Sequence, residues 1–208
     1  MLGCETLTGF FLAAVVLALV PGPDNLYVLT QSMLLGRRAG LVATCGFCTG
    51  LVVHTLGVAL GVAALLQTSS LAFILLKLCG AGYLIYLAWR LLGITETGEG
   101  ASGLAEASPW RLYRRSIIMN VTNPKVALFF LAFLPQFTDP GAGPVVWQML
   151  LFGLLFMLAT LLVFGSVALL ATGIASGLMQ RPRVQLQVRR LAALIFLLLA
   201  IRLALAGN

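Results

Sequence analysis

The sequence predicts an all-α membrane protein with six transmembrane helices, arranged as two inverted three-helix repeats. Three observations predict this fold: long apolar runs, very few charged residues, and a proline-containing interruption early in each half of the chain. Hydrophobic residues make up 61% of the 208 residues and charged residues only 9%, whereas a soluble domain has about 25% charged residues. A run of about 20 apolar residues is long enough to cross a bilayer as a helix.

Six such spans are predicted, and they cover about residues 6–34, 40–65, 70–92, 113–135, 145–170 and 187–206. No basic segment precedes the first run, which continues into a proline-rich break, so we expect a retained span rather than a cleaved signal peptide. The longest polar stretch, Gly93 to Pro109, contains Gly and Ser without an apolar period, which is typical of a flexible linker. The predicted organisation is therefore a first half at 1–95, a cytoplasmic linker at 96–110 and a second half at 111–208.

The first and fourth spans contain the predicted helix breaks. The segment Pro21-Gly22-Pro23 interrupts the first span, and Pro124 interrupts the fourth. Proline removes a backbone donor and clashes with the preceding helical turn. Non-helical backbone at membrane depth is tolerated only where it is buried in protein or lines a water-filled cavity. Because paired breaks in corresponding halves mark the binding sites of transporters, we expect the two breaks to form one site near the membrane midplane.

The distribution of basic residues predicts the topology. If the N-terminus is outside, ten of the thirteen Lys and Arg residues lie on the cytoplasmic side: Arg37, Arg38, Arg90, Arg111, Arg114, Arg115, Arg181, Arg183, Arg189 and Arg190. Cytoplasmic loops carry an excess of Lys and Arg, so both termini are predicted to face the periplasm. Since each half has three spans, the second half must be inverted relative to the first. The net charge of +7 thus comes from short topological clusters, which argues against a nucleic-acid-binding face.

Each break carries an ionisable side chain, Asp24 in the first half and Lys125 in the second. A charge at the centre of a membrane costs at least about 2.5 kcal/mol and is a functional hypothesis by default. Two structural alternatives remain, because Asp is a favoured helix cap and Lys can form an ion pair or extend to the interface. Asn25, Asn120 and Asn123 add amide groups around the breaks, which either bind a substrate or satisfy the backbone groups that proline frees. The predicted substrate-binding residues are Pro23, Asp24, Asn25, Asn123 and Lys125.

The only histidine, His54, shares one helix face with Gly46 and Gly50 at spacings of four residues. Glycines at this spacing allow two membrane helices to approach closely. Held in such an interface, His54 either relays protons near neutral pH or forms a structural hydrogen bond to a neighbouring helix. Asp24 and His54 are therefore the two candidates for proton coupling. Helix packing is predicted at Gly46, Gly50, Gly80 and Gly82.

An alternative function comes from Cys45 and Cys48, which form a C-x-x-C pattern. A membrane thiol–disulfide carrier would use such a pair, although cysteine also serves as a small apolar residue in helices. With one histidine in the chain, a metal site is not expected. No cofactor motif is present, and no nucleophile–base pair indicates an enzyme.

Several motifs, in order along residues 10–205, resemble the lysine exporter / homoserine–threonine resistance (LysE/RhtB) family. They are Pro21-Gly22-Pro23, Gly36-Arg37-Arg38-Ala39-Gly40, Gly46-x-x-x-Gly50-x-x-x-His54, Gly80-Ala-Gly-Tyr-Leu-Ile-Tyr-Leu87, Asn120-Val-Thr-Asn123-Pro124-Lys125 and Phe133-Leu-Pro-Gln-Phe137. The resemblance implies a six-span exporter of amino acids in a bacterial inner membrane, driven by the proton gradient. It places the chain nearer the neutral amino-acid branch and does not fix the substrate. Its implied partners are a small amino acid, protons and the lipid bilayer, with no nucleic acid, and a homo-oligomer is left open.

Overall fold

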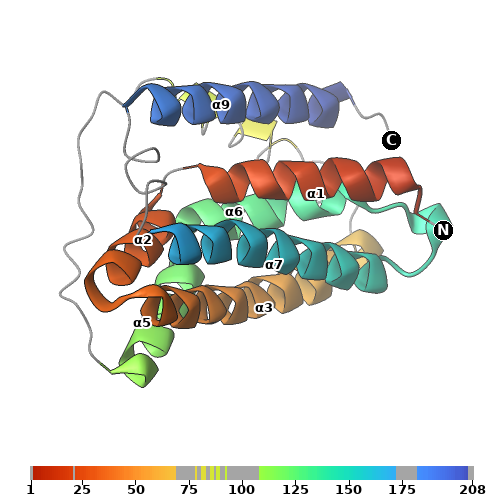
Figure 1. Ribbon diagram of the computed structural model, residues 1–208. Helices are drawn as coiled ribbons and strands as arrows, with labels where there is room; N and C mark the ends of the chain where they lie inside the picture. The colour runs from red at the N-terminus through yellow and green to blue at the C-terminus, as the bar shows by residue number, and fades with distance from the viewer. Residues whose placement is uncertain are drawn as a thin grey trace.

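The computed structural model describes residues 2–20, 22–68, 108–171 and 182–205, together with single residues between 78 and 92. This part of the chain is helical and contains no strand, which confirms the all-α prediction for the described residues (Figure 1). The α-helices are α1 (Cys4–Leu19), α2 (Pro23–Leu35), α3 (Arg37–Thr68), α5 (Pro109–Val121), α6 (Pro124–Phe133), α7 (Val145–Leu170) and α9 (Pro182–Leu205). Two short 3-10 helices, η1 (Leu134–Phe137) and η2 (Pro140–Ala142), lie between α6 and α7.

Two helices are long and apolar enough to cross a membrane alone, α3 over Arg37–Gly61 and α7 over Val145–Leu170. Two bent pairs meet the same criterion when each is taken as one span, so the described residues hold two to four candidate spans. Helix α1 is bent by 61° against α2, and helix α5 by 53° against α6 and the turn after it. The third predicted span, 70–92, lies almost entirely outside the described residues. Helix α9 covers most of the sixth.

Local sequence accounts for where the helices start and stop around the two bends. Helices α2, α5 and α6 each begin at a proline, which is favoured at the first helical position because its missing N–H is not needed there. Helix α2 ends at Gly36, whose φ of 86° lies in the left-handed region that glycine adopts without steric cost. Pro21 itself lies outside the described residues. The chain changes direction at 20–22 and again at 122–123.

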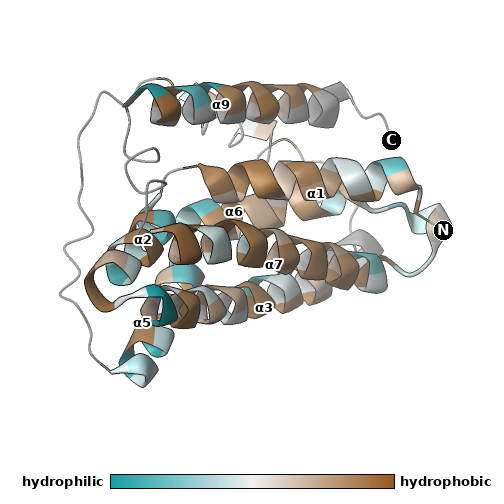
Figure 2. Ribbon diagram, viewed as in Figure 1, coloured by the Kyte–Doolittle hydropathy of each residue, from teal (hydrophilic) through white to brown (hydrophobic). Residues whose placement is uncertain are grey.

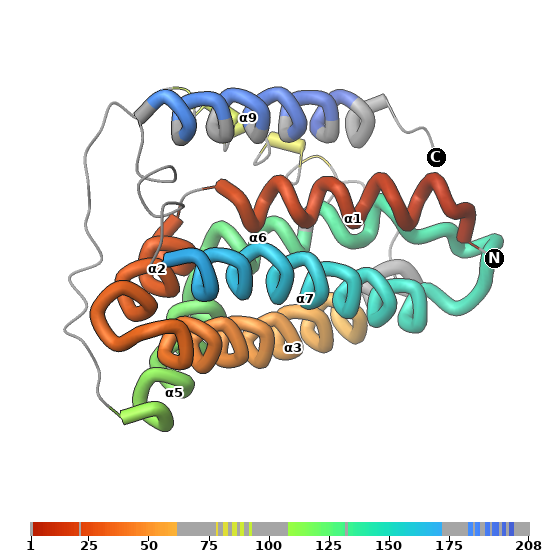
Figure 3. Tube along the Cα trace, in the orientation of Figure 1, coloured from red at the N-terminus to blue at the C-terminus, as the bar shows by residue number. Residues whose placement is uncertain are grey.

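The helices form a bundle in which α7 packs against α1, α2 and α3, while α3 also packs against α5 (Figures 1 and 3). Two groups of aromatic side chains fill its interior. The phenylalanine cluster consists of Phe10, Phe129, Phe130, Phe133, Phe137, Phe152 and Phe156, with ring centroids 4.3 to 6.5 Å apart. The aromatic triad is Tyr27, Phe47 and Phe164, on α2, α3 and α7. The two bends meet at the boundary between these groups.

The outer surface of the bundle is apolar along the helices and basic at one end. Large leucines such as Leu60 on α3 and Leu154 on α7 are more than half exposed, and an apolar surface of this kind is expected where helices face lipid. In Figure 2 the middle of α7 is hydrophobic, whereas the starts of α3 and α9 are hydrophilic and lie at the left of the view. Arg37, Arg111 and Arg183 stand at the starts of α3, α5 and α9.

Candidate functional site

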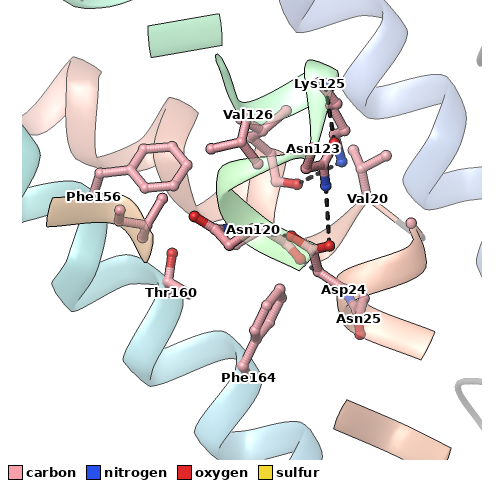
Figure 4. Close-up of a pocket in the computed structure, with 14 residues that line it drawn as sticks. Val20, Asp24, Asn25, Asn120, Asn123, Lys125, Val126, Phe156, Thr160 and Phe164 are labelled. Carbon is pink, nitrogen blue, oxygen red and sulfur yellow. Dashed lines mark hydrogen bonds between the residues drawn. The ribbon is translucent and has the colours of Figure 1, made fainter. Parts of the chain in front are cut away.

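The two bends, together with α3 and α7, line a small, partly open cavity, shown in Figure 4. Its volume is about 40 Å³, which is enough for a few water molecules but far below the roughly 300 Å³ or more of typical ligand pockets. The cavity is therefore too small, as it stands, to hold an amino acid. The cavity is lined by Leu17, Ala18, Val20, Gly22, Asp24, Asn25, Leu51, Asn120, Asn123, Lys125, Val126, Phe156, Thr160 and Phe164.

Asp24 is the second residue of α2 and is 7% exposed. Its two carboxylate oxygens accept hydrogen bonds from the second bend: Asn123 Nδ2 donates to Oδ1 over 3.0 Å and Asn120 Nδ2 donates to Oδ2 over 3.4 Å. The first turn of a helix also carries free backbone N–H groups and the positive end of the helix dipole. The carboxylate of α2 is thus held in place by two side-chain amides of the second bend.

Lys125 occupies the matching position, as the second residue of α6. Its Nζ donates to the carbonyl of Leu17 over 3.4 Å, near the end of α1, and a Cβ built at Gly22 would lie 3.6 Å from Nζ. Among the described residues, no ion pair joins Lys125 to Asp24, although both side chains line the cavity. The two opposite charges therefore share one cavity while each is held by groups other than its counterpart.

The asparagines link the two bends to each other and bind backbone groups at the helix ends next to the bends. Asn25 Nδ2 donates to the carbonyl of Ala18 over 2.9 Å, so an α2 side chain satisfies a carbonyl near the end of α1. Asn123 caps α6, because its Oδ1 accepts from the backbone N–H of Lys125 over 3.0 Å. Both residues satisfy backbone groups as well as lining the cavity.

Asn120, near the end of α5, is 2% exposed and holds several parts of the site together. Its Nδ2 binds Asp24, and its backbone carbonyl lies 3.1 Å from Nε2 of His54 on α3. Its Oδ1 is buried and has no hydrogen-bond partner among the described residues. A buried acceptor without a donor is costly, so Asn120 Oδ1 is an acceptor that no described residue satisfies.

The glycines of α3 set its close approach to α5. A Cβ at Gly46 would lie 2.5 Å from the carbonyl oxygen of Tyr113, and one at Gly50 would lie 2.7 Å from Cβ of Asn120. Real carbon contacts are about 3.5–4.0 Å, so only glycine fits these two positions without a shift. His54, one turn further on, is half-buried, and its ring centroid lies 5.8 Å from that of Phe130. It does not line the cavity.

Comparison with known proteins identifies the family. The family model described as LysE type translocator matches residues 15–207. The chain belongs to this family. Leucine efflux proteins of Salmonella typhimurium (strain LT2) and Salmonella typhi are 34% identical to the translocator over 134 residues, which cover 64% of this chain and 63% of theirs. An uncharacterized membrane protein of Pseudomonas aeruginosa is 38% identical over 147 residues, 67% of each chain. No solved structure matches the chain.

The match to the leucine efflux proteins spans less than two thirds of their length. Neither these relatives nor the family model supports the alternative of a thiol–disulfide carrier. In this protein, Cys45 is exposed and free, and Cys48 is free with its Sγ 3.8 Å from the carbonyl of Met157. Within the described residues, no three His, Cys, Asp or Glu side chains are grouped as a metal site would require.

Sequence reasoning missed several side chains of this cavity. Asn120 was noted as an amide beside the second break but was not placed among the predicted substrate-binding residues, although its place four residues before Pro124 was a usable signal. Thr160 and Phe164 come from α7, a uniformly apolar helix in which nothing distinguishes cavity-facing residues from the rest. At Gly82 a Cβ would meet no described atom within 4 Å, and Gly80 lies outside the described residues, so packing at these two positions stays a prediction.

Proposed function

We propose that the translocator exports amino acids from the cytoplasm across the bacterial inner membrane, with a preference for neutral amino acids and in exchange for protons. One observation carries the proposal: Asp24 and Lys125, from two separate helix bends, line one cavity without forming an ion pair. Two opposite charges in one cavity match the two charged ends of an amino acid. Family membership and the similarity to leucine efflux proteins support the same function.

The α-ammonium group of the substrate would bind Asp24 and Asn120. A carboxylate has about four acceptor sites, and the amides of Asn120 and Asn123 occupy two of those on Asp24. Asn120 Oδ1, which lacks a donor among the described residues, supplies another acceptor. The α-carboxylate would bind Lys125, since an ammonium has three donors and the carbonyl of Leu17 takes one.

The rest of the cavity wall supports the preference for neutral side chains. Leu51, Val126, Phe156 and Phe164 present apolar surface next to the charged pair, and Thr160 adds one hydroxyl. Each ionisable group of this wall is already assigned to one end of the amino acid. A charged substrate side chain would therefore be buried without a partner, which is costly, whereas an aliphatic side chain gains from burial.

Transport requires the small cavity to enlarge and to open alternately to each side of the membrane. We assign this motion to the two halves, 1–95 and 111–208, which would form six spans as inverted repeats joined by the cytoplasmic linker 96–110. The proline-containing bends would let one half rock against the other around a midplane site. The basic starts of α3, α5 and α9 at one end of the bundle support a topology with both termini in the periplasm.

We attribute proton exchange to competition between a proton and the substrate's ammonium group for the carboxylate of Asp24. One carboxylate cannot hold both a proton and the substrate's ammonium group, so protonation from the periplasm would release the amino acid and deprotonation in the cytoplasm would prepare the next cycle. His54 is the second proton-coupling candidate. His54 contacts the backbone of Asn120, and the side chain of Asn120 binds Asp24. Asn120 therefore contacts both proton-coupling candidates.

Efflux from proteoliposomes tests the proposal. Vesicles containing the purified protein are loaded with radiolabelled leucine, threonine, lysine or glutamate, and an inward proton gradient is imposed. Efflux of leucine should exceed that from protein-free vesicles and should slow when an ionophore collapses the gradient, while lysine and glutamate should stay inside. If no amino acid leaves faster than from protein-free vesicles, the proposed function is wrong.

A further inference from the structure

Gln31 on α2 is entirely buried, and neither Nε2 nor Oε1 of its amide has a hydrogen-bond partner among the described residues. Gln148 on α7, by contrast, is a glutamine whose amide oxygen and nitrogen are both hydrogen-bonded within the protein. Its Oε1 accepts from Asp139 N over 2.8 Å, and its Nε2 donates to the carbonyls of Asp139 and Gly143 over 2.7 and 2.9 Å. A buried amide without partners costs stability. Hydrogen bonds account for the burial of Gln148, whereas no hydrogen bond among the described residues accounts for the burial of Gln31.

The position of Gln31 relates it to the cavity. It follows Asp24 by seven residues, two helical turns, and therefore lies on the same face of α2. Tyr27 lies between them on this face and is T-shaped against Phe47, with ring centroids 6.3 Å apart. Phe47 in turn contacts Phe164 over 5.7 Å, and Phe164 lines the cavity. The aromatic triad thus connects the cavity wall at Phe164 to Tyr27, which lies between Asp24 and Gln31 along α2; it is called the partition below.

A cation contacts this partition. The guanidinium carbon of Arg115 lies 5.5 Å from the ring centroid of Tyr27, within the range of a cation–π contact. Arg115 belongs to the basic first part of α5, and α2 ends next to Arg37 and Arg38. By the proposed topology, Gln31 therefore lies on the cytoplasmic side of the triad, where the exported substrate arrives.

We propose that Gln31 forms a second binding position for zwitterionic amino acids, occupied on the cytoplasmic side before the triad opens to the cavity. The amide offers a donor for the α-carboxylate and an acceptor for the α-ammonium group, and both are unused among the described residues. A substrate at this position would satisfy the buried amide as the partition opens, and Arg115 would attract its carboxylate. This inference rests on the proposed export function and adds a second position to its single cavity.

The two glutamines provide a matched test. Gln31→Leu and Gln148→Leu replace the same buried residue type with an apolar one of similar size. Gln31→Leu should leave the thermal unfolding midpoint in detergent unchanged or raised, because it removes an unsatisfied amide. It should also raise the KM for leucine efflux roughly tenfold, since a hydrogen bond to a charged group is lost. Gln148→Leu should lower the midpoint, because it deprives Asp139 and Gly143 of their partners, while the KM of the folded fraction stays unchanged.

Two results would overturn the second binding position while leaving the export function intact. If Gln31→Leu lowers the unfolding midpoint as Gln148→Leu does, buried waters satisfy the amide and its role is structural. If Gln31→Leu keeps the wild-type KM, no substrate binds there before the cavity. A wild-type protein that exports no amino acid in the same vesicles would instead refute the proposed function, and the second position with it.

Discussion

Replacing Gly50 with Ala adds one methyl group between α3 and α5, directly beside the candidate site. The new Cβ would lie 2.7 Å from both Cβ and Oδ1 of Asn120, about 1 Å closer than carbon atoms normally approach. Gly57 is the matched control, because it lies on the same helix, is exposed, and has nothing within 4 Å of a built Cβ. Any difference between Gly50→Ala and Gly57→Ala therefore reflects the contact with Asn120.

The contacts of Gly50 and Gly57 indicate how far each variant should change stability and efflux. Ala is favoured over Gly inside a helix by roughly 0.5–1 kcal/mol, and this gain applies to both variants. Overpacking costs about 1–3 kcal/mol and applies only at Gly50, so Gly50→Ala should be the less stable variant by about that amount. Asn120 Nδ2 already lies 3.4 Å from Asp24, so a further shift breaks this bond. Losing a hydrogen bond to a charged group costs about 1.5–3 kcal/mol, and Asp24 then loses one of the two amides that position it, so leucine efflux should fall as well.

Thermal unfolding of both variants in the same detergent measures the first effect, and leucine efflux per folded protein in vesicles measures the second. Gly57→Ala should match or exceed the wild-type midpoint and export normally. If Gly50→Ala is as stable and as active as Gly57→Ala, the close contact between α3 and Asn120 does not support the site and the reasoning is wrong.

Two further predictions concern topology and the cysteines. In a cysteine-free background, a single Cys at Gly141 should react with an impermeant thiol reagent in intact cells, whereas one at Gly100, in the predicted cytoplasmic linker, should react only after permeabilisation; the reverse pattern would refute the topology. Changing all four cysteines to Ser should leave leucine efflux near the wild-type rate, because Cys45 and Cys48 lie outside the cavity, and complete loss of efflux with normal folding would favour thiol chemistry instead.

The sequence predicted part of the site because prolines and ionisable residues interrupt its apolar runs. Proline in a long apolar run and an ionisable residue at membrane depth are local signals, and they drew attention to Asp24 and Lys125, which the structure places at one cavity. The partners of these charges were not predictable, because hydrogen bonds such as Lys125 Nζ to the carbonyl of Leu17 depend on how helices distant in sequence pack. Phe164 gave no signal, since it is one apolar residue in an apolar helix. Gln31 is a polar residue in a predicted span, but only the fold shows that its amide is buried without a partner among the described residues.

The central claim is that Asp24 and Lys125 bind the two ends of one amino acid. Its most direct test is leucine efflux by Asp24→Asn, Lys125→Gln and the double variant, each compared at equal amounts of folded protein. Both single variants should lose at least about tenfold in efflux, since each loses a charged contact to the substrate. The efflux that remains in Asp24→Asn should depend less on pH than that of the wild type. The double variant should fold and stay inactive. Full activity in either single variant, or recovery of efflux in the double variant as expected of a structural ion pair, would contradict the claim.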